Sequence, residues 1–162
     1  DRQGFLDDVR AALWSSKVVA YSQGLDEIRT AAQEYGWQVD MAKVASIWRD
    51  GCIIRARLLQ RIHDEYAAND LTTLLEAPSV KAELASSQAS WRRVVARAAE
   101  AGVPVPGFSA ALSYYDQVRA PRLNAALTQG LRDLFGAHTY RRVDDQGSWH
   151  LQWSGDGSEV SA

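Results

Sequence analysis

The chain has 162 residues and a formal net charge of −2, with 46% hydrophobic and 23% charged residues, which is typical of a soluble globular domain large enough to bury a core. This charge and a sequence pI of about 5.9 exclude a basic footprint for nucleic acid or for an anionic membrane, so we expect neither as a partner. The single cysteine, Cys52, excludes an internal disulfide and predicts a reducing, cytoplasmic setting, and no apolar run approaches membrane-spanning length.

Residues 5 to 35 carry the pattern of one long helix. Apolar or small residues recur there at helical spacing, without proline. The middle, from Leu13 to Tyr21, is apolar on almost every side except at Lys17, which predicts a helix that passes through a core. At 1.5 Å per residue the helix would be roughly 45 Å long, more than the width of such a domain, so we expect another chain or domain to cover part of it. Gly36 is suited to cap its C-terminal end.

Further amphipathic stretches predict helices over residues 40–48, 54–68, 71–76, 79–101, 108–120 and 121–135. Asp40 is a good N-cap, Gly51 is expected to mark a bend, and the proline-rich residues 103–107 predict an extended connector. Pro121 suits the first turn of the last helix. The fold class is therefore all-α, a helical array with one long central helix.

The helical pattern fails after Arg141. We expect a helical domain over residues 1–143 and an extended C-terminal tail over residues 144–162. Residues 149–153 contain two tryptophans and could pair as a strand or lie extended on a partner, whereas residues 154–158 should be flexible. No convincing strand is predicted elsewhere.

Signals for catalysis are missing. The one G-x-G, Gly155-Asp-Gly157, has no helix after it and is no dinucleotide site. The histidines have no metal-binding spacing, so we expect no metal. Cys52 stands between a glycine and two isoleucines, a context that favours a buried, inert thiol. We therefore expect no catalytic residue in this chain.

Several basic residues have a structural interpretation that competes with a functional one. Arg92 and Arg93 could form a phosphate patch, but a solvated helix face is favoured. Structural ion pairs are favoured for Arg49 and Arg55. Lys17 could bind a ligand. The favoured interpretation is that its aliphatic side chain lies along a crevice and places the ammonium group in solvent.

Arg132 and His138 are the candidate site residues. An arginine at a helix end and a histidine just beyond the Phe135-Gly136 turn can converge on one anion. Arginine offers a planar fork of donors that suits phosphate, and histidine adds a donor. The alternative is an ion pair between Arg132 and Asp133 or a tail carboxylate, with His138 as a helix-end cap. Residues alone leave both interpretations open.

At these residues the sequence resembles 6-phosphogluconate dehydrogenase, in the C-terminal part of its all-α domain. The resemblance runs in order from about Phe5 to the end of the chain. Its most specific stretches are W-R-x-G-C-I-I-R and R-D-x-F-G-A-H-T-Y. The matching segments are Ser16–Gly24, Trp48–Arg55, Ser90–Arg93, Ala110–Asp116 with Arg119, Arg132–Tyr140 and Trp153–Gly155.

The resemblance implies NADP-dependent oxidative decarboxylation of 6-phosphogluconate to ribulose 5-phosphate and CO₂ in the pentose phosphate pathway. It implies a homodimer in which the C-terminal part of one subunit reaches the other subunit's active site. Arg132 would bind the substrate phosphate of the neighbouring subunit, and His138 would contact the same end of the substrate. Residues 148–157 would thread across the partner.

The resemblance also implies what this chain lacks. The family's Rossmann domain, which binds NADP, its catalytic Lys and Glu, and its Lys-Gly-Thr-Gly-x-Trp signature would precede Asp1, so we expect the chain to be inactive alone. Asp50 stands where the family commonly has glycine, Gly130 falls within the last helix, and Leu134 replaces an aromatic residue. The alternative function is a free-standing helical oligomerisation module that reuses this scaffold. A nucleic-acid-binding helical domain is a third interpretation, which the acidic pI opposes.

Overall fold

The computed structural model describes residues 1–49 and 53–161. The predictions made for Asp50, Gly51 and Cys52 lie outside the described residues. The chain divides into two compact units, Asp1–Asp116 and Gln117–Ala162, and each unit is considered by itself. The boundary predicted after residue 143 is a different kind of division, between helical domain and tail, and it stays a prediction.

Most of the described chain is helical, which confirms the all-α fold class. The helices follow in the order α1 Arg2–Tyr35, α2 Met41–Ile47, α3 Arg57–Ala68, the 3₁₀ helix η1 Leu74–Glu76, α4 Pro78–Glu100, α5 Pro106–Arg119 and α6 Ala125–Gly136. The strands β1 Trp149–Leu151 and β2 Glu159–Ser161 follow α6. In the described part of the chain, no helix combines the length and the apolar character needed to cross a membrane.

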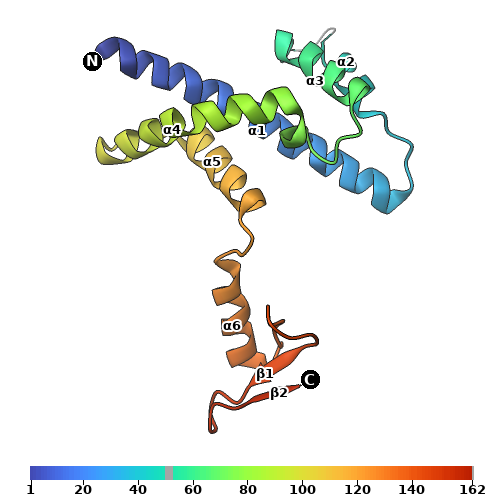
Figure 1. Cartoon of the computed structure of the whole chain (residues 1–162), viewed down its shortest axis with the longest axis vertical. Helices are drawn as coiled ribbons and strands as arrows, with labels where there is room; N and C mark the ends of the chain where they lie inside the picture. The colour runs from blue at the N-terminus through green and yellow to red at the C-terminus, as the bar shows by residue number, and fades with distance from the viewer. Residues whose placement is uncertain (50–52, 162) are drawn as a thin grey trace. The chain divides into compact units, whose positions relative to one another are not determined.

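The long first helix is confirmed. α1 ends where Gly36 takes a left-handed φ of 68° and donates its N–H to the carbonyl of Ala32, a conformation that glycine adopts without strain. α1 and α4 lie against each other (Figure 1). Small side chains allow this close approach, and Ser15 Oγ lies 2.7 Å from Ser87 Oγ in a shared hydrogen bond.

Trp91 lies in the core of the first unit. Its side chain is fully buried, its indole Nε1 donates to the carbonyl of Phe108 at 3.2 Å, and its ring lies 6.1 Å from that of Tyr115. One residue therefore joins α4 to α5 through both packing and a hydrogen bond. The core around it comprises Ala12, Val18, Val19, Leu25, Ala45, Leu59, Ile62, Leu74, Ala77, Val80, Leu84, Val94, Ala111 and Leu112.

Some local predictions hold and others are wrong. Asp40 caps α2 as predicted, because its side chain accepts from the backbone N–H of Lys43. Ile47, within the helix predicted over residues 40–48, is 70% exposed. Ile54 was expected within a helix, yet α3 begins only at Arg57. Helical spacing alone does not tell which face of a short segment the neighbouring helices will cover.

The start of the last helix was also predicted wrongly. Pro121 was expected in its first turn, but α6 begins at Ala125 and residues 121–122 form a bend. The 3₁₀-type bond from the N–H of Ala126 to the carbonyl of Leu123 brings the chain into the helix only after that bend. A proline tolerates the first helical turn, but it does not require a helix to begin there.

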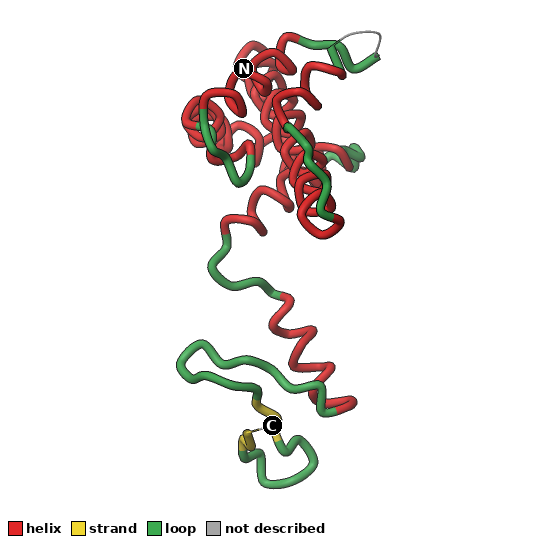
Figure 2. The backbone as a smooth tube through the Cα atoms, turned by 90° about the vertical axis from the view of Figure 1, so that its right-hand side faces the viewer, coloured by secondary structure: helices red, strands yellow, loops and turns green. Residues whose placement is uncertain are grey.

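The tail folds back into a small hairpin in the second unit (Figure 2). β1 and β2 pair antiparallel, with His150 opposite Val160, which confirms a strand within residues 149–153. The absence of other strands was predicted wrongly, because β2 is present. Its three residues are too few to show an alternating pattern. Tyr140 also forms an isolated antiparallel bridge to Trp149, so the chain after α6 lies beside β1.

Candidate functional site

Arg132 and His138 both lie at the C-terminal end of α6, in the second unit. The helix ends at Gly136, and Ala137 takes a left-handed φ of 51° while its N–H donates to the carbonyl of Asp133. Thr139 is also left-handed, with a φ of 59°. This tight reversal places the exposed side chain of His138 directly after α6, the helix that carries the exposed side chain of Arg132.

Gly136 leaves room for the ring of His138. A Cβ atom at position 136 would lie only 3.0 Å from His138 Nε2 and 3.1 Å from Cδ2. The imidazole therefore folds back over the backbone of the last helical turn. Any larger residue at position 136 would displace the ring, which gives a physical reason for the glycine in this stretch.

Gln129 links the two candidate residues. Arg132 Nη1 donates to Gln129 Oε1 at 2.9 Å. The amide nitrogen of the same glutamine donates to the carbonyl of Thr139 at 2.5 Å and, more weakly, to that of His138 at 3.5 Å. One side chain therefore holds the guanidinium and the His138 backbone in a fixed relation.

Asp133 lies beside Arg132 in sequence and is fully buried. Its Oδ1 accepts from the backbone N–H of Thr139 at 2.9 Å and from His150 Nδ1 at 2.9 Å. Its Oδ2 accepts from the backbone N–H of Leu151 at 3.0 Å and from Trp153 Nε1 at 2.8 Å. Both carboxylate oxygens thus join α6 to the loop that follows it and to β1.

These donors decide the charge state of Asp133. Burial by itself would raise the pKa of the carboxyl, but hydrogen bonds from Leu151, His150, Trp153 and Thr139 outweigh it and hold the pKa well below its usual range. The carboxylate is therefore ionised at neutral pH, and His150 Nδ1 must be the donor in their shared bond.

A surface network fixes the rest of the tail. Arg142 forms ion pairs with Asp144 at 2.6 Å and with Glu159, and its guanidinium carbon lies 5.4 Å from the centre of the Trp149 ring. Tyr140 donates its hydroxyl to Glu159, a bond that raises the pKa of Tyr140 to about 12. These contacts join the segment after α6 to β2.

The proposed ion pair between Arg132 and Asp133 does not form. The carboxylate of Asp133 is occupied by the donors above, and among the described residues no carboxylate lies within ion-pair distance of Arg132. The guanidinium is exposed and bound to a neutral amide. It therefore retains its charge and donors for an anion.

The other arginine candidates have structural partners. Arg92 pairs with Asp116 at 2.5 Å and Arg93 with Asp8 at 2.5 Å. The bond from Arg93, together with Ser90, lowers the pKa of Asp8 to about 2. Both guanidinium groups therefore bind carboxylates of neighbouring helices, which favours a structural role for Arg92 and Arg93 over a phosphate patch.

The remaining basic candidates lie in the first unit. Arg49 donates to the neutral Gln60, where an ion pair was expected, and the side chains of Arg55 and Lys17 are exposed. Among residues 1–49 and 53–161, no group of three His, Cys, Asp or Glu side chains is arranged to hold a metal ion.

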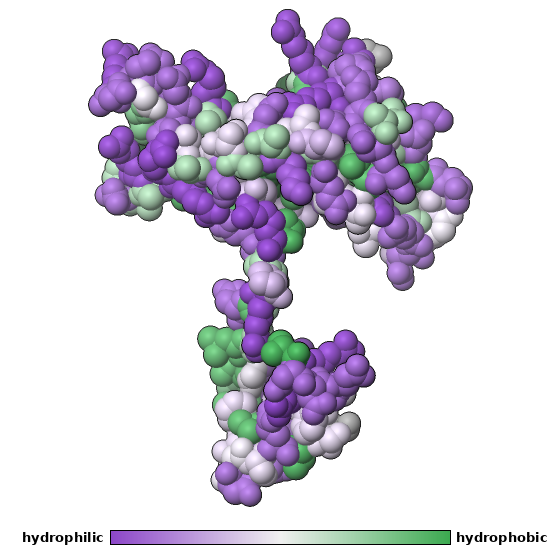
Figure 3. All heavy atoms as spheres, viewed as in Figure 1, coloured by the Kyte–Doolittle hydropathy of each residue, from purple (hydrophilic) through white to green (hydrophobic). Residues whose placement is uncertain are grey.

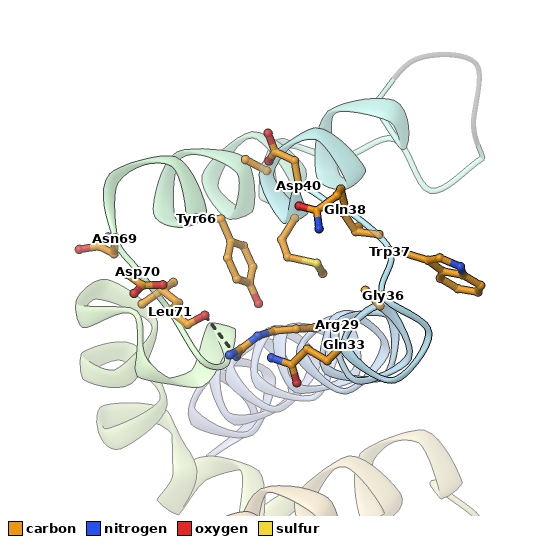
Figure 4. Close-up of a pocket in the computed structure, with 14 residues that line it drawn as sticks. Arg29, Gln33, Gly36, Trp37, Gln38, Asp40, Tyr66, Asn69, Asp70 and Leu71 are labelled. Carbon is orange, nitrogen blue, oxygen red and sulfur yellow. Dashed lines mark hydrogen bonds between the residues drawn. The ribbon is translucent and has the colours of Figure 1, made fainter.

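The first unit contains an open pocket between the end of α1 and α3 (Figure 4). Arg29 extends along it but donates to the carbonyls of Leu71, at 3.4 Å, and Thr72. Burial and then the charge of Asp26 raise the pKa of Tyr66, on the opposite wall, to about 12. The guanidinium is engaged and the phenol stays neutral, so neither Arg29 nor Tyr66 is suited to transfer a proton in this pocket.

Gln129, Asp133, His150 and Trp153 were not predicted as site residues. Asp133 itself is an acidic residue beside apolar ones near the end of a helix, and nothing in the local sequence marks it as buried. The donors to Asp133 come from residues up to 20 positions later, and no local pattern identifies them.

Comparisons with known proteins give a consistent result. The family model for "6-phosphogluconate dehydrogenase, C-terminal domain" matches residues 1–153. A decarboxylating 6-phosphogluconate dehydrogenase of Synechococcus elongatus is 49% identical over 154 residues, which cover 94% of this chain and 33% of that protein. The Escherichia coli enzyme of the same name is 47% identical, with the same coverage. A chloroplastic enzyme from rice is 47% identical over 95% of this chain.

A solved structure agrees with these relatives. The 6-phosphogluconate dehydrogenase of Plasmodium falciparum, solved in its apo form, with NADP⁺ and with 6-phosphogluconate, superposes with a TM-score of 0.89 at 37% identity. The match covers 94% of this chain and 33% of that protein. The chain thus spans about a third of the length of the relatives it matches.

Proposed function

Because the chain belongs to the decarboxylating 6-phosphogluconate dehydrogenase family, as its C-terminal domain, we propose that it contributes the substrate-phosphate clamp of such an enzyme. Arg132 and His138 bind the phosphate of 6-phosphogluconate in the active site of a neighbouring subunit. The whole protein oxidises and decarboxylates this substrate to ribulose 5-phosphate and CO₂ with NADP.

One observation carries the proposal. Arg132 presents an exposed guanidinium that pairs with no described carboxylate, and His138 follows it on a loop tied to the same glutamine. Two donors held this way suit the oxygens of a phosphate. Binding the phosphate far from the reacting carbons orients the substrate, so that remote binding energy serves the chemical step.

The described residues contain no fold typical of dinucleotide binding. β1 and β2 form an antiparallel hairpin, and no strand–glycine turn–helix unit is present in residues 1–49 and 53–161 to cradle a dinucleotide. We therefore assign NADP, and the catalytic Lys and Glu, to a part of the protein outside this chain. The isolated chain is then inactive. A cytoplasmic setting remains a prediction, since the relatives include a chloroplastic enzyme.

The surface of α6 supports a homodimer. Its polar side faces the tail, whereas apolar side chains one turn apart are exposed, among them Phe135 at 83% and Leu127 at 74%. Figure 3 shows this apolar surface in the second unit. A helix exposes its apolar side to water only at a free-energy cost, and we propose that a second copy covers it.

The clamp is tested in the whole protein that carries this chain, with Arg132→Ala. We expect the KM for 6-phosphogluconate to rise by about tenfold or more, because a charge-assisted pair contributes about 1.5–3 kcal/mol, while the KM for NADP stays unchanged. Arg141→Ala is the matched control, since Arg141 is exposed in the same unit. An unchanged KM for 6-phosphogluconate in Arg132→Ala would exclude the clamp.

The dimer is tested separately by sedimentation of the whole protein. A charge on the apolar side of α6, in Leu131→Glu, should shift the protein toward the monomer. Leu131 is 45% exposed, and Val103→Glu places the same charge on a residue of the first unit that is 53% exposed. A variant that sediments as the wild type does would exclude this face as the dimer interface.

A further inference from the structure

We infer that Asp133 is the positioning residue of the phosphate clamp, because its buried carboxylate holds the loop that carries His138 and the tail onto the helical turn that carries Arg132. The inference rests on the proposed function, since the loop matters for turnover only if it binds the substrate. Asp133 touches no substrate itself.

The position of Asp133 on α6 supports this role. Consecutive residues of a helix point about 100° apart, so Asp133 faces inward while the adjacent Arg132 faces outward. The inward carboxylate receives the N–H of Thr139, the residue directly after His138, at 2.9 Å. A shift of this carboxylate would therefore move the backbone on which the imidazole is mounted.

The same carboxylate fixes the other side of the loop. Its Oδ2 receives the N–H of Leu151 on β1 and the indole N–H of Trp153, at 3.0 and 2.8 Å. Tyr140, which follows the loop, exchanges backbone hydrogen bonds of 2.8 Å with Trp149 on the same strand. The segment after α6 is thus held at two places, at Thr139 by Asp133 and at Tyr140 by the β1 strand.

Only an ionised carboxylate can accept all these bonds. Each oxygen of Asp133 receives two N–H donors. In Asp133→Asn one of these oxygens becomes an NH₂ group, which would point donors at donors. Thr139 and His150 would lose their acceptor in one orientation of the amide, and Leu151 and Trp153 in the other.

The left-handed residues of the loop explain why it needs an anchor. Ala137 and Thr139 both have positive φ, at 51° and 59°, a conformation that costs about 1–2 kcal/mol for residues with a Cβ atom. Such a loop keeps this conformation only where its surroundings hold it. The Asp133 carboxylate, bonded to the N–H of Thr139, is a contact that does so.

The test compares Asp133→Asn with Arg132→Ala and with Asp145→Asn in the whole protein. Asp145→Asn makes the same chemical change at an exposed aspartate of the same unit, which bonds only locally, to the N–H of Gln146. Two quantities are measured: the KM values for 6-phosphogluconate and NADP, and the amide hydrogen exchange of residues 137–153 in the absence of substrate.

We expect Asp133→Asn to raise the KM for 6-phosphogluconate by about tenfold or more, the scale of a small misplacement of binding groups, with the KM for NADP unchanged within about twofold. The amides of Thr139 and Leu151 should exchange faster. Asp145→Asn should match the wild type. In a background of Arg132→Ala, Asp133→Asn should add little to the rise in KM, because it acts through the same clamp.

Each contrary result has its own meaning. If Arg132→Ala raises the KM for 6-phosphogluconate but Asp133→Asn does not, the positioning role is wrong and the clamp stands. If Arg132→Ala leaves this KM unchanged, the proposed function itself is wrong. If Asp133→Asn leaves the exchange at Thr139 and Leu151 unchanged, the positioning role is wrong whatever the kinetics show.

Should Asp133→Asn fail to fold, Trp153→Phe applies the same test more gently. It keeps the carboxylate and removes one donor to Oδ2. We expect a smaller rise in the KM for 6-phosphogluconate, about two- to fivefold, because the three other donors to the carboxylate remain and the loop shifts less. A KM equal to that of the wild type would overturn the positioning role.

Discussion

Gln129 and Arg132 lie one helical turn apart on α6, and the guanidinium Nη1 donates to the glutamine Oε1 at 2.9 Å. Because the amide nitrogen of Gln129 also donates to the Thr139 carbonyl, Gln129→Leu removes both bonds with little change in volume. In the whole protein we expect the KM for 6-phosphogluconate to rise about threefold to tenfold. Gln146→Leu, at an exposed loop position, should leave it unchanged, and equal KM values for the two variants would contradict the linking role.

Gly136→Ala should separate stability from binding. Alanine favours a helix over glycine by about 0.5–1 kcal/mol, but the added Cβ would lie 3.0 Å from His138 Nε2, so the imidazole must move. We expect unchanged or higher thermal stability together with a higher KM for 6-phosphogluconate.

Gly130→Ala is the matched control for that variant. Gly130 lies in the same helix, and a Cβ there would meet nothing within 4 Å. It should stabilise the second unit without altering the KM. If Gly136→Ala and Gly130→Ala raised the KM equally, the rise would come from a change in the helix and not from displacement of the His138 ring.

The Asp133 network should resist acid. Hydrogen bonds depress the folded-state pKa of this carboxyl below its ordinary value of 3.8. The stabilising contribution is therefore fully present above about pH 4 and is lost only as the pH falls through the lower, folded-state pKa. We expect the side-chain carboxyl carbon resonance of Asp133 to show its own titration only below about pH 4. A titration midpoint for this carboxyl above pH 4 would contradict the assignment.

Local pattern predicted the long elements well. The predictions of the helices over residues 2–35 and 78–100 depend on many apolar positions at helical spacing. A single residue that departs from the pattern does not change such a prediction. The start of α6 depended on one residue, Pro121, and was placed too early. Short segments such as β2 depend on partners elsewhere in the chain, which no local pattern records.

The sequence pointed only to the exposed residues of the candidate site. Arg132 and His138 stand out because their side chains suit an anion, and the arrangement of the loop is consistent with that prediction. Asp133 looked like a partner for Arg132, since the two are adjacent. Its burial depends on donors from Leu151 and Trp153, whose approach is a property of the folded tail.

Trp91 should be a major contributor to the stability of the first unit. Trp91→Phe removes the hydrogen bond to the carbonyl of Phe108 and leaves a void, so we expect a loss of about 1–3 kcal/mol in the free energy of unfolding. Trp37 is 59% exposed. Trp37→Phe should therefore change the free energy of unfolding by less than about 0.5 kcal/mol. Urea denaturation measures the free energy of unfolding of both variants. Similar denaturation midpoints for Trp91→Phe and Trp37→Phe would contradict a major role of Trp91 in stability.

Asp26 should make the first unit less stable as the pH rises. Burial raises its pKa, although Thr73, Tyr114 and Ser22 donate hydrogen bonds to it. The folded state then binds a proton that the unfolded state has released, so the free energy of unfolding falls as the pH rises from about 4 through the folded-state pKa. Asp26→Asn should flatten this dependence.

The control for that variant is Glu27→Gln, at the exposed neighbouring position, which should keep the pH dependence of the wild type. Denaturant unfolding at a series of pH values measures both. If the free energy of unfolding of Asp26→Asn still falls with pH as in the wild type, another titratable group causes the pH dependence.

The donors to Asp133 all come from residues 6 to 20 positions later in the chain. Closing such short loops costs little chain entropy, and contacts of this kind form quickly during folding. The hydrogen bonds of Asp133 all lie within the segment from Gln117 onward and are short in sequence separation. A chimaera that carries residues 117–162 of this chain in a distant relative should therefore keep the hydrogen bonds of Asp133 and the loop that holds His138.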